Sequence, residues 1–197
     1  SHPLPSPRYN FYRWFPRGQV VFMAPTKPLV QQQLTACYDI VGMSAEDTAI
    51  LLGSVTAKKR RTLWDTRRVF FCTPQTMLND IRKGAIDMKR IVCIVVDEAH
   101  RAAGNYAYCL VVQELKAVHT RFRVLALSAT PGKDFNKIQD VINNLMITKL
   151  EVRGDDDPDV RRSVVLRFSA GVCLFVCVFV YLCACVLVCV LTRGAFG

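Results

Sequence analysis

The sequence predicts an α/β domain, built from a mainly parallel sheet flanked by helices and followed by an apolar C-terminal tail. Between residues 19 and 153, short apolar runs alternate with longer helical stretches, which is typical of consecutive βαβ units. Several runs are apolar on both faces, as strands buried between two helix layers are. Hydrophobic residues make up 51% of the 197 residues and charged residues 21%, so wholesale disorder is excluded.

Each predicted element follows from this alternation. The expected strands are residues 19–24, 48–52, 69–72, 91–96, 124–127 and 147–152. The expected helices are residues 29–41, 58–65, 75–83, 106–118 and 134–145. The last helix has an apolar stripe, because Ile138, Val141, Ile142 and Leu145 recur at spacings of three and four residues.

Four regions are predicted along the chain. Residues 1–18 form an N-terminal extension with a partial helix, and residues 19–153 form the α/β domain. Residues 154–162 contain the run Asp-Asp-Asp-Pro-Asp, which is typical of a solvated linker. Residues 163–197 form the tail, which is rich in valine and cysteine.

The chain is basic, with 26 Lys and Arg residues against 16 Asp and Glu residues and a formal net charge of +10. The tail contains two arginines and no acid, so residues 1–162 carry 24 basic and 16 acidic residues, or +8. This excess favours a polyanionic partner, either nucleic acid or an anionic membrane surface. The cysteines before the tail lack C-x-x-C spacing and are predicted to be reduced structural thiols of an intracellular protein. They are Cys37, Cys72, Cys93 and Cys109.

The candidate functional residues lie at the ends of the predicted strands, because parallel sheets bind ligands beyond the carboxyl ends of their strands. Strand 91–96 runs directly into Asp97-Glu98-Ala99-His100. Two carboxylates there are costly unless they act at the edge of the sheet. Asp97 suits a Mg²⁺ ion beside nucleotide phosphates, and Glu98 suits a water that attacks the terminal phosphate. The alternative is an acidic surface pair that caps the next helix.

Hydroxyl groups follow three other predicted strands. Thr26 follows the first, Thr73 the third, and Ser128 with Thr130 the fifth. Each one alone is typical of a helix N-cap or a turn. Together with Asp97, they mark four strand ends of one parallel sheet and favour a shared ligand-binding edge.

These strand ends carry a resemblance to a known family. Asp97-Glu98-Ala99-His100 resembles motif II of superfamily 2 DEAH-box helicases, and Ser128-Ala129-Thr130 resembles motif III. Ala24-Pro25-Thr26-Lys27-Pro28-Leu29-Val30 resembles motif Ia, Gly53-Ser54 the glycine motif that follows it, and Thr73-Pro74-Gln75 motif Ib. Within the superfamily, segments 10–16, 21–30, 104–109 and 122–132 resemble the Fanconi anaemia group M family of DNA translocases. The resemblance covers about residues 10–162.

The resemblance implies the RecA-like first lobe of an ATP-dependent helicase or translocase that remodels DNA in repair. It implies ATP and Mg²⁺ as cofactors, Asp97 as the residue that holds Mg²⁺ and Glu98 as the residue that activates water. Coupling between nucleotide and DNA would fall to His100, Ser128 and Thr130. The DNA backbone would be contacted by Thr26, Lys27, Gly53, Ser54, Thr73 and Gln75. The implied partners are branched or double-stranded DNA and repair-complex proteins, and the implied location is the nucleus. Phosphate contacts carry no base information, so the motifs alone leave RNA open as the substrate.

Two further segments have alternative interpretations. The run Lys58-Lys59-Arg60-Arg61, with Arg67-Arg68, either widens the DNA track or forms a solvated helix face. The aromatic run 11–15 predicts core packing by a preceding helix rather than a platform for base stacking.

A motor of this family needs a phosphate loop, G-x-x-x-x-G-K-[S/T], whose amides and lysine bind phosphate. The single Gly-Lys pair in the sequence is Gly132-Lys133, which Asp134 follows. We expect the loop to have been cut off ahead of residue 10 rather than mutated, and the second lobe to be absent as well. Negligible ATPase activity is therefore expected of this chain alone.

The tail contains an uncharged apolar stretch, residues 171–191, about as long as a bilayer-spanning helix. A membrane anchor is one interpretation. The recurring Val-Cys pairs suggest another, because a TG dinucleotide repeat is translated as Val-Cys in every forward frame, so the tail would be intron or intergenic read-through. Two alternatives to a motor fragment follow: a non-catalytic DNA-binding fragment, and a membrane-tethered interaction protein if the tail is genuine.

Overall fold

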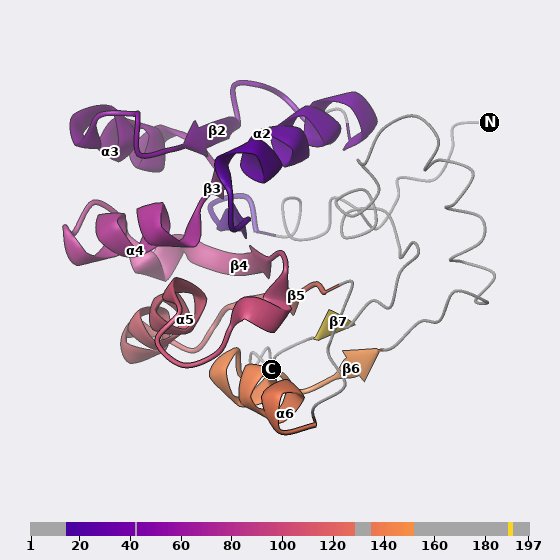
Figure 1. The fold of residues 1–197 in the computed structure, drawn as a ribbon. Helices are drawn as coiled ribbons and strands as arrows, with labels where there is room; N and C mark the ends of the chain where they lie inside the picture. The colour runs from indigo at the N-terminus through magenta and orange to yellow at the C-terminus, as the bar shows by residue number, and fades with distance from the viewer. Residues whose placement is uncertain (1–14, 42, 129–134, 152–188, 191–197) are drawn as a thin grey trace.

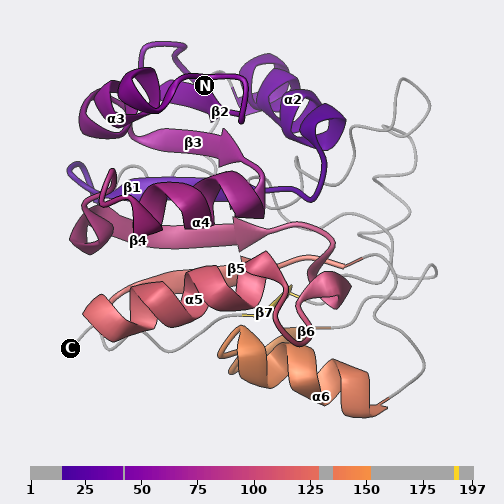
Figure 2. The ribbon, with the colours of Figure 1, turned by 60° about the vertical axis from the view of Figure 1, so that its left-hand side comes forward.

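The computed structural model describes residues 15–41, 43–128, 135–151 and 189–190 (Figure 1). Its centre is a five-stranded sheet in the order β2-β3-β1-β4-β5, in which all neighbouring strands are parallel. The strands are β1 (Gln19–Met23), β2 (Thr48–Leu51), β3 (Val69–Cys72), β4 (Ile91–Val96) and β5 (Arg123–Ala126). Figure 2 shows their arrowheads at one side of the molecule. The predicted parallel α/β sheet is confirmed.

The strand order places β1 at the centre of the sheet. The chain first builds β3 and β2 on one side of β1 and then crosses over to build β4 and β5 on the other. In an open parallel sheet, such a reversal leaves a crevice at the carboxyl ends of the central strands. The segments that follow β1 and β4 lie at this position.

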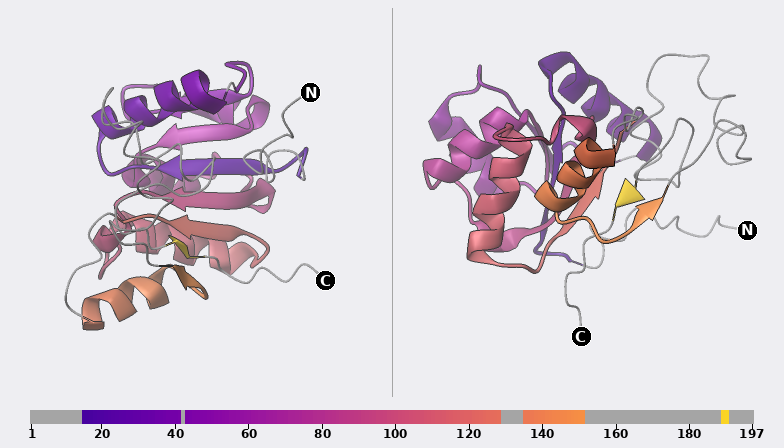
Figure 3. Two further views of the ribbon diagram at one scale, coloured as in Figure 1. Left: turned by 90° about the vertical axis from the view of Figure 1, so that its right-hand side faces the viewer. Right: turned by 60° about the horizontal axis from the view of Figure 1, so that its bottom comes forward.

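Helices occupy both faces of the sheet, with α2 on the face opposite α3, α4 and α5 (Figure 1). They begin and end within two residues of the predicted bounds when the π-helical turn after α2 is included. The helices are α2 (Lys27–Ala36) with its turn Cys37–Val41, α3 (Ala57–Thr66), α4 (Pro74–Arg82), α5 (Ala107–Val118) and α6 (Phe135–Asn144). The 3-10 turns Met88–Arg90 and Ala99–Arg101 lie immediately before and shortly after β4. Figure 3 shows α6 beyond the β5 end of the sheet.

The core has two layers, one on each face of the sheet. In β1, Val21 and Met23 pack in the layer with α3, α4 and α5, whereas Val20 and Phe22 pack in the layer with α2. All five residues of β1 are buried. This is the pattern predicted from strands that are apolar on both faces, and burial of each large side chain stabilises the fold by about 1.5–3 kcal/mol.

The predicted strand 147–152 is wrong as a member of the parallel sheet. The observed strand β6 is Leu150–Glu151, which pairs antiparallel with β7 (Cys189–Val190). Ile147 instead belongs to the C-terminal turn of α6, in which its amide donates to the Ile142 carbonyl at 2.9 Å and Met146 has a φ of 56°. This is the Schellman arrangement, in which an apolar residue after the helix packs back on its last turn. Ile147 is therefore apolar because it packs at the C-terminal end of α6, not because it belongs to a strand.

The remaining predictions about segments fall partly outside the described residues. The N-terminal extension up to residue 14, the linker and the tail apart from Cys189–Val190 lie outside them, so these domain bounds stay predictions. Across the described ranges, no helix combines the length and apolarity needed to cross a bilayer. The four cysteines before the tail are buried free thiols, as predicted.

Candidate functional site

The segments after β1, β4 and β5 are joined at one edge of the sheet by backbone hydrogen bonds. The amide of Asp97 donates to the Met23 carbonyl at 2.9 Å, and the amide of Ala99 donates to the Leu127 carbonyl at 2.7 Å. The acidic pair therefore lies beside the end of β1 and directly next to Ser128. The predicted meeting of these strand ends at one carboxyl edge is confirmed.

Asp97 is a buried carboxylate, with 1% of its surface exposed. Its Oδ1 accepts a hydrogen bond from the Glu98 amide at 2.9 Å. Burial raises the pKa of Asp97 from 3.8 to about 6; the Glu98 amide opposes this rise, and the Glu98 charge adds to it. A carboxylate kept at this energetic cost is typical of a functional site rather than of packing.

The surroundings of Asp97 fit a Mg²⁺ ion that a nucleotide shares. The part of the chain that the structure describes has no cluster of three or more His, Cys, Asp or Glu side chains that could hold a metal. Mg²⁺ in nucleotide-binding enzymes needs no such cluster, because one or two carboxylates, substrate phosphates and water complete its shell. Asp97 is the residue that would hold it.

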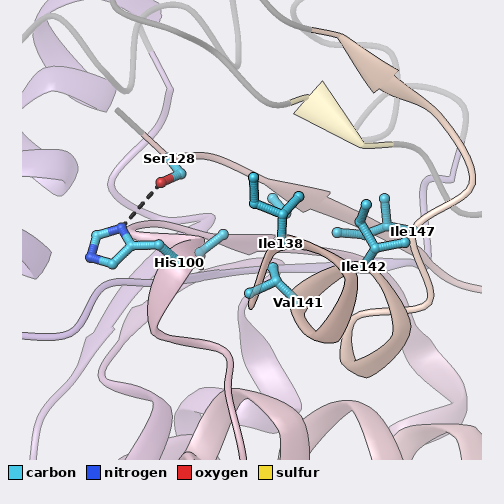
Figure 4. A pocket seen from close by; sticks show the side chains of 8 residues that line it. His100, Ser128, Ile138, Val141, Ile142 and Ile147 are labelled. Atoms are coloured by element: carbon cyan, nitrogen blue, oxygen red, sulfur yellow. Dashed lines mark hydrogen bonds between the residues drawn. The ribbon is translucent and has the colours of Figure 1, made fainter. Parts of the chain in front are cut away.

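Glu98, His100 and Ser128 form one polar chain across the β4 and β5 loops. Nδ1 of His100 lies 3.2 Å from Oε2 of Glu98. The same atom lies 3.1 Å from Oγ of Ser128 (Figure 4). A protonated Nδ1 donates toward both oxygens. Glu98 has left-handed backbone angles (φ 53°, ψ 46°), which cost a non-glycine residue about 1–3 kcal/mol and turn the chain sharply after Asp97. The contact between His100 and Ser128 brings together the two predicted motifs.

Tyr108 holds the backbone of the acidic turn in place, a role that was not predicted from the sequence. Its side chain is fully buried on α5, and its hydroxyl donates to the Asp97 carbonyl at 2.7 Å and lies 3.3 Å from the Met23 carbonyl. It thereby holds the ends of β1 and β4 together. The available signal was a tyrosine at the centre of an apolar helical stretch, which needs a buried partner for its hydroxyl.

Four of the predicted DNA-contacting residues are exposed at the carboxyl edge. Thr26 is the N-cap of α2 and makes no side-chain capping bond, and Lys27 is the first residue of the helix. Gly53 and Ser54 lie in the exposed loop between β2 and α3. Their hydroxyls, backbone amides and charge are therefore accessible to a phosphate backbone.

Thr73 and Gln75 are partly engaged within the protein. Thr73 is the N-cap of α4, and its Oγ1 lies 2.9 Å from Oγ1 of Thr76. Gln75 is exposed, and its Nε2 donates to Oδ1 of Asn79 at 3.1 Å. Thr73 therefore caps α4, the structural alternative considered above, and also lies at the carboxyl edge. Thr130 lies outside the described residues, so its role stays a prediction.

Neither interpretation of the basic run, a widened DNA track or a solvated helix face, holds at Arg60. This side chain is 7% exposed, and its Nη2 lies 2.7 Å from Oδ1 of Asp80 while its Nη1 donates to the Val55 carbonyl. Nε1 of Trp64 donates to the same carboxylate at 3.1 Å. The sequence could not distinguish this buried ion pair from a solvated charge, because Asp80 comes from a different helix.

The other basic residues of this track divide between two edges. Lys58, Lys59 and Arg61 are exposed on α3. Arg67 and Arg68 precede β3 and reach the backbone carbonyls of Glu46 and Phe15. Arg67 and Arg68 therefore lie at the opposite edge of the sheet from Gly53 and Ser54 and do not continue that track.

An apolar pocket adjoins the polar chain. The predicted stripe of α6 supplies Ile138, Val141 and Ile142 to its wall, and His100 and Ser128 form its polar end (Figure 4). Leu145, the last residue of the stripe, is fully buried. α6 thus packs against the turn that carries His100.

A family model for DEAD/DEAH box helicases matches residues 10–138, well over half of the chain. The chain belongs to this family. The motifs that predicted the resemblance all lie within the matched residues, and the acidic tetrapeptide has the DEAH form.

Individual relatives of this helicase chain agree with the Fanconi group M resemblance. The Fanconi anemia group M protein homolog of Mus musculus is 55% identical over 77% of this chain and 8% of its own length. The ATP-dependent DNA helicase fml1 of Schizosaccharomyces pombe is 51% identical over 79% of this chain and 19% of its own length. The chain thus spans less than a fifth of these relatives.

A solved structure gives the corresponding result for the fold. The helicase domain of Pyrococcus furiosus Hef superposes with a TM-score of 0.70 and 38% identity, covering 79% of this chain and 32% of that chain. The predicted RecA-like helicase lobe is confirmed.

Proposed function

We propose that this chain forms the first motor lobe of an ATP-dependent DNA helicase or translocase. The observation that carries the proposal is the position of Asp97 and Glu98 at the edge that also holds Ser128, beside the end of the central strand β1. This is where a parallel sheet binds a nucleotide. The name of the Schizosaccharomyces pombe relative, an ATP-dependent DNA helicase, supports ATP and DNA as the ligands.

Asp97 and Glu98 have different tasks in this proposal. Asp97 holds Mg²⁺, which when bound neutralises charge on the nucleotide phosphates. Glu98 is half-buried, and it orients a water toward the terminal phosphate and accepts its proton. The sharp turn at Glu98 allows the two consecutive carboxylates to serve different positions.

His100, Ser128 and Thr130 couple the nucleotide to nucleic acid. His100 contacts both the candidate base Glu98 and Ser128 of the neighbouring loop, so a displacement of either loop changes the polar chain. Ser128 immediately precedes Ala129-Thr130, the rest of the predicted motif.

Thr26, Lys27, Gly53, Ser54, Thr73 and Gln75 contact the nucleic-acid backbone in this proposal. The exposure of the first four supports it, because phosphate binding requires accessible amides, hydroxyls and cations. We further propose branched or double-stranded DNA as the substrate and nuclear repair complexes as the setting, in line with the Fanconi group M relatives.

Hydrolysis requires a phosphate loop in addition to this edge. No Gly-Lys pair followed by Ser or Thr occurs in the 197 residues. We therefore propose that this polypeptide alone has negligible ATPase activity, and that DNA binding without turnover is its activity in isolation. DNA-stimulated phosphate release by the purified polypeptide would contradict this.

A chimera tests the motor proposal directly. Residues 10–150 of this chain replace the corresponding segment of the mouse relative, which is 55% identical. The chimera is expected to hydrolyse ATP in a DNA-dependent manner, whereas the same chimera with Asp97→Asn does not. A chimera that folds and binds DNA but hydrolyses ATP equally well with Asp97→Asn would refute the role of this edge.

A further inference from the structure

A second candidate binding surface lies at the amino edge of the sheet, opposite the carboxyl edge that carries Asp97. An open recess of about 400 Å³ lies where β1 and β4 begin. It is lined by residues 15–18, Lys89, Arg90 and Val92. A volume of this size is within the range of pockets that hold small ligands or single nucleotides.

The floor of the recess is shaped by a close approach of two strands. Gln19 pairs with Ile91 and Val20 with Cys93, so Val92 is the extra residue of a bulge in the ladder. A Cβ atom on Gly18 would lie 2.7 Å from a methyl carbon of Val92, so a side chain at position 18 would not fit. Bulges of this kind redirect side chains and frequently adjoin functional sites.

Two cations at the mouth of the recess have no acidic partner among the described residues. The ion pairs in the described ranges join Arg60 with Asp80, Arg82 with Glu114, and Glu98 with His100. Arg17 and Lys89 are exposed and take part in none of them. Because Gln19 pairs with Ile91, Arg17 and Lys89 precede adjacent strands by the same two residues, and both line the recess.

The neighbouring groups leave this positive charge in excess. The half-buried Arg90 donates to the Asp65 carbonyl at 3.4 Å. The nearest acid along the chain, Asp87, accepts from the Lys89 amide at 3.1 Å and caps the 3-10 turn. Arg17, Lys89 and Arg90 all line the recess, and none of the described residues that line it is acidic.

Basic residues recur along the amino edge, except before β2, which Glu46 and Asp47 precede. Basic residues immediately precede or open three of the parallel strands besides β1: they are Arg67, Arg68, Lys89, Arg90 and Arg123. Helix C-termini attract cations, and this explains part of the pattern, since Arg67 is the C-cap of α3. It does not explain Arg17, which follows no described helix.

We propose that this recess binds a phosphodiester of a nucleic-acid strand, as a second contact separate from the carboxyl edge. Paired cations beside an aromatic and a proline wall suit a phosphate and its attached base, with no requirement for a particular sequence. Phe15 and Pro16 supply that wall. An acidic peptide would lack a base to pack against these rings.

The test uses the full 197-residue chain and a labelled oligothymidylate of about ten nucleotides. Anisotropy titrations at several salt concentrations compare wild type with the double variant Arg17→Gln/Lys89→Gln. The variant is expected to lower affinity about tenfold and to reduce the salt slope by about 1.4, since each single-strand phosphate contact contributes about 0.7. Lys116→Gln/Lys137→Gln removes the same charge from exposed sites on α5 and α6 and is expected to have little effect. Equal effects of the two double variants would overturn the proposal.

Photo-crosslinking of the wild-type chain gives an answer that does not depend on a folded variant. An oligonucleotide containing 4-thiothymidine is expected to label peptides that contain residues 15–18 or 89–92. Absence of label there would overturn the proposal. Two competition results would also overturn the proposal. If thymidine monophosphate competes as strongly as the oligonucleotide, the recess binds a free nucleotide. If polyglutamate does so, the recess binds an acidic protein.

The same experiment separates this inference from the proposed motor edge. The variant Lys27→Gln/Lys58→Gln removes two exposed cations from the carboxyl edge. If the motor edge binds no nucleic acid, this variant leaves affinity unchanged and no label appears at residues 24–27 or 53–54, whereas the amino-edge results stand unaltered.

Discussion

The two edges of the central sheet differ in how they use charge. At the carboxyl edge, the carboxylate of Asp97 is buried and Glu98 is half-buried, and Arg60 in the first turn of α3 is paired with Asp80 within the core. At the amino edge, Arg17 and Lys89 are exposed, and neither forms an ion pair with another described residue. The carboxyl edge therefore holds acidic groups in fixed positions beside its exposed cations, whereas the recess at the amino edge is lined by cations alone among its charged residues.

This difference follows from the direction of the chain in a parallel α/β sheet. Every strand ends at the carboxyl edge and is followed by a loop and a helix N-terminus, where hydroxyls cap and acids are favoured. Helices end at the amino edge, where cations are favoured. Chemistry that needs precise positions suits the first edge, where helix N-termini can also contact phosphates, and exposed cations give the second edge a sequence-independent attraction for phosphate.

The largest expected effect tests whether the carboxyl edge performs the chemistry. In the mouse chimera, Glu98→Gln removes the base that activates water. This substitution is expected to lower kcat by about 10²- to 10⁴-fold, because general-base catalysis usually contributes a factor of that size. Steady-state ATPase assays measure it. Lys116→Gln, at an exposed site on α5, serves as the control in the same chimera and is expected to leave kcat unchanged. A similar loss in both variants would contradict the assigned role of Glu98.

A second substitution tests whether Arg60 is structural. Arg60→Ala leaves the Asp80 carboxylate buried without its partner and is expected to lower the free energy of unfolding by about 3–5 kcal/mol. The exposed pair between Arg82 and Glu114, at 3.8 Å, provides the matched control. Arg82→Ala is expected to cost less than about 1 kcal/mol. Urea unfolding of both variants measures the difference, and equal losses would contradict the assignment.

The third prediction concerns the cost of keeping Asp97 charged. Its pKa is raised from 3.8 to about 6 in the folded protein, so folding favours the neutral form. Asp97→Asn, which keeps an acceptor for the Glu98 amide, is expected to stabilise the fold at pH 7 by about 3 kcal/mol at most. The advantage should be absent below about pH 4, grow as pH rises to about 6 and then level off.

Chemical denaturation of wild type and Asp97→Asn across this pH range measures that advantage. Lys89→Gln provides the amino-edge control, with a difference from wild type that stays constant over the same range. A constant difference for Asp97→Asn as well would show that the buried carboxylate carries no such cost.

The smallest expected effect concerns Tyr108. Tyr108→Phe removes the hydroxyl that reaches the Asp97 and Met23 carbonyls and keeps the buried ring. The free energy of unfolding is expected to fall by about 1–2 kcal/mol, because two buried carbonyls lose a donor. Tyr38→Phe removes a hydroxyl that contacts the Thr48 side chain at 2.6 Å in a half-buried position and serves as a control with a smaller loss. Thermal unfolding compares the two.

The position of a site residue could be predicted from the sequence where it depends only on that residue and its place relative to a strand. Asp97 follows a strand that is apolar throughout, and that position alone placed it at the carboxyl edge. The prediction failed at Ile147, whose apolarity is equally compatible with a strand and with the end of a helix. Arg60 and Tyr108 were misjudged or missed because their partners lie on other elements.

The amino-acid sequence by itself determined the parallel α/β architecture, since alternating periodicities and two-faced apolar runs report local conformation and burial. It also determined which residues stand at strand ends, and therefore which edge each one reaches. Only the tertiary structure decided the strand order, the pairing of Arg60 with Asp80 and the recess between Arg17 and Lys89. These depend on how distant segments pack together, and no local pattern specifies the partner of a charge or the neighbour of a strand.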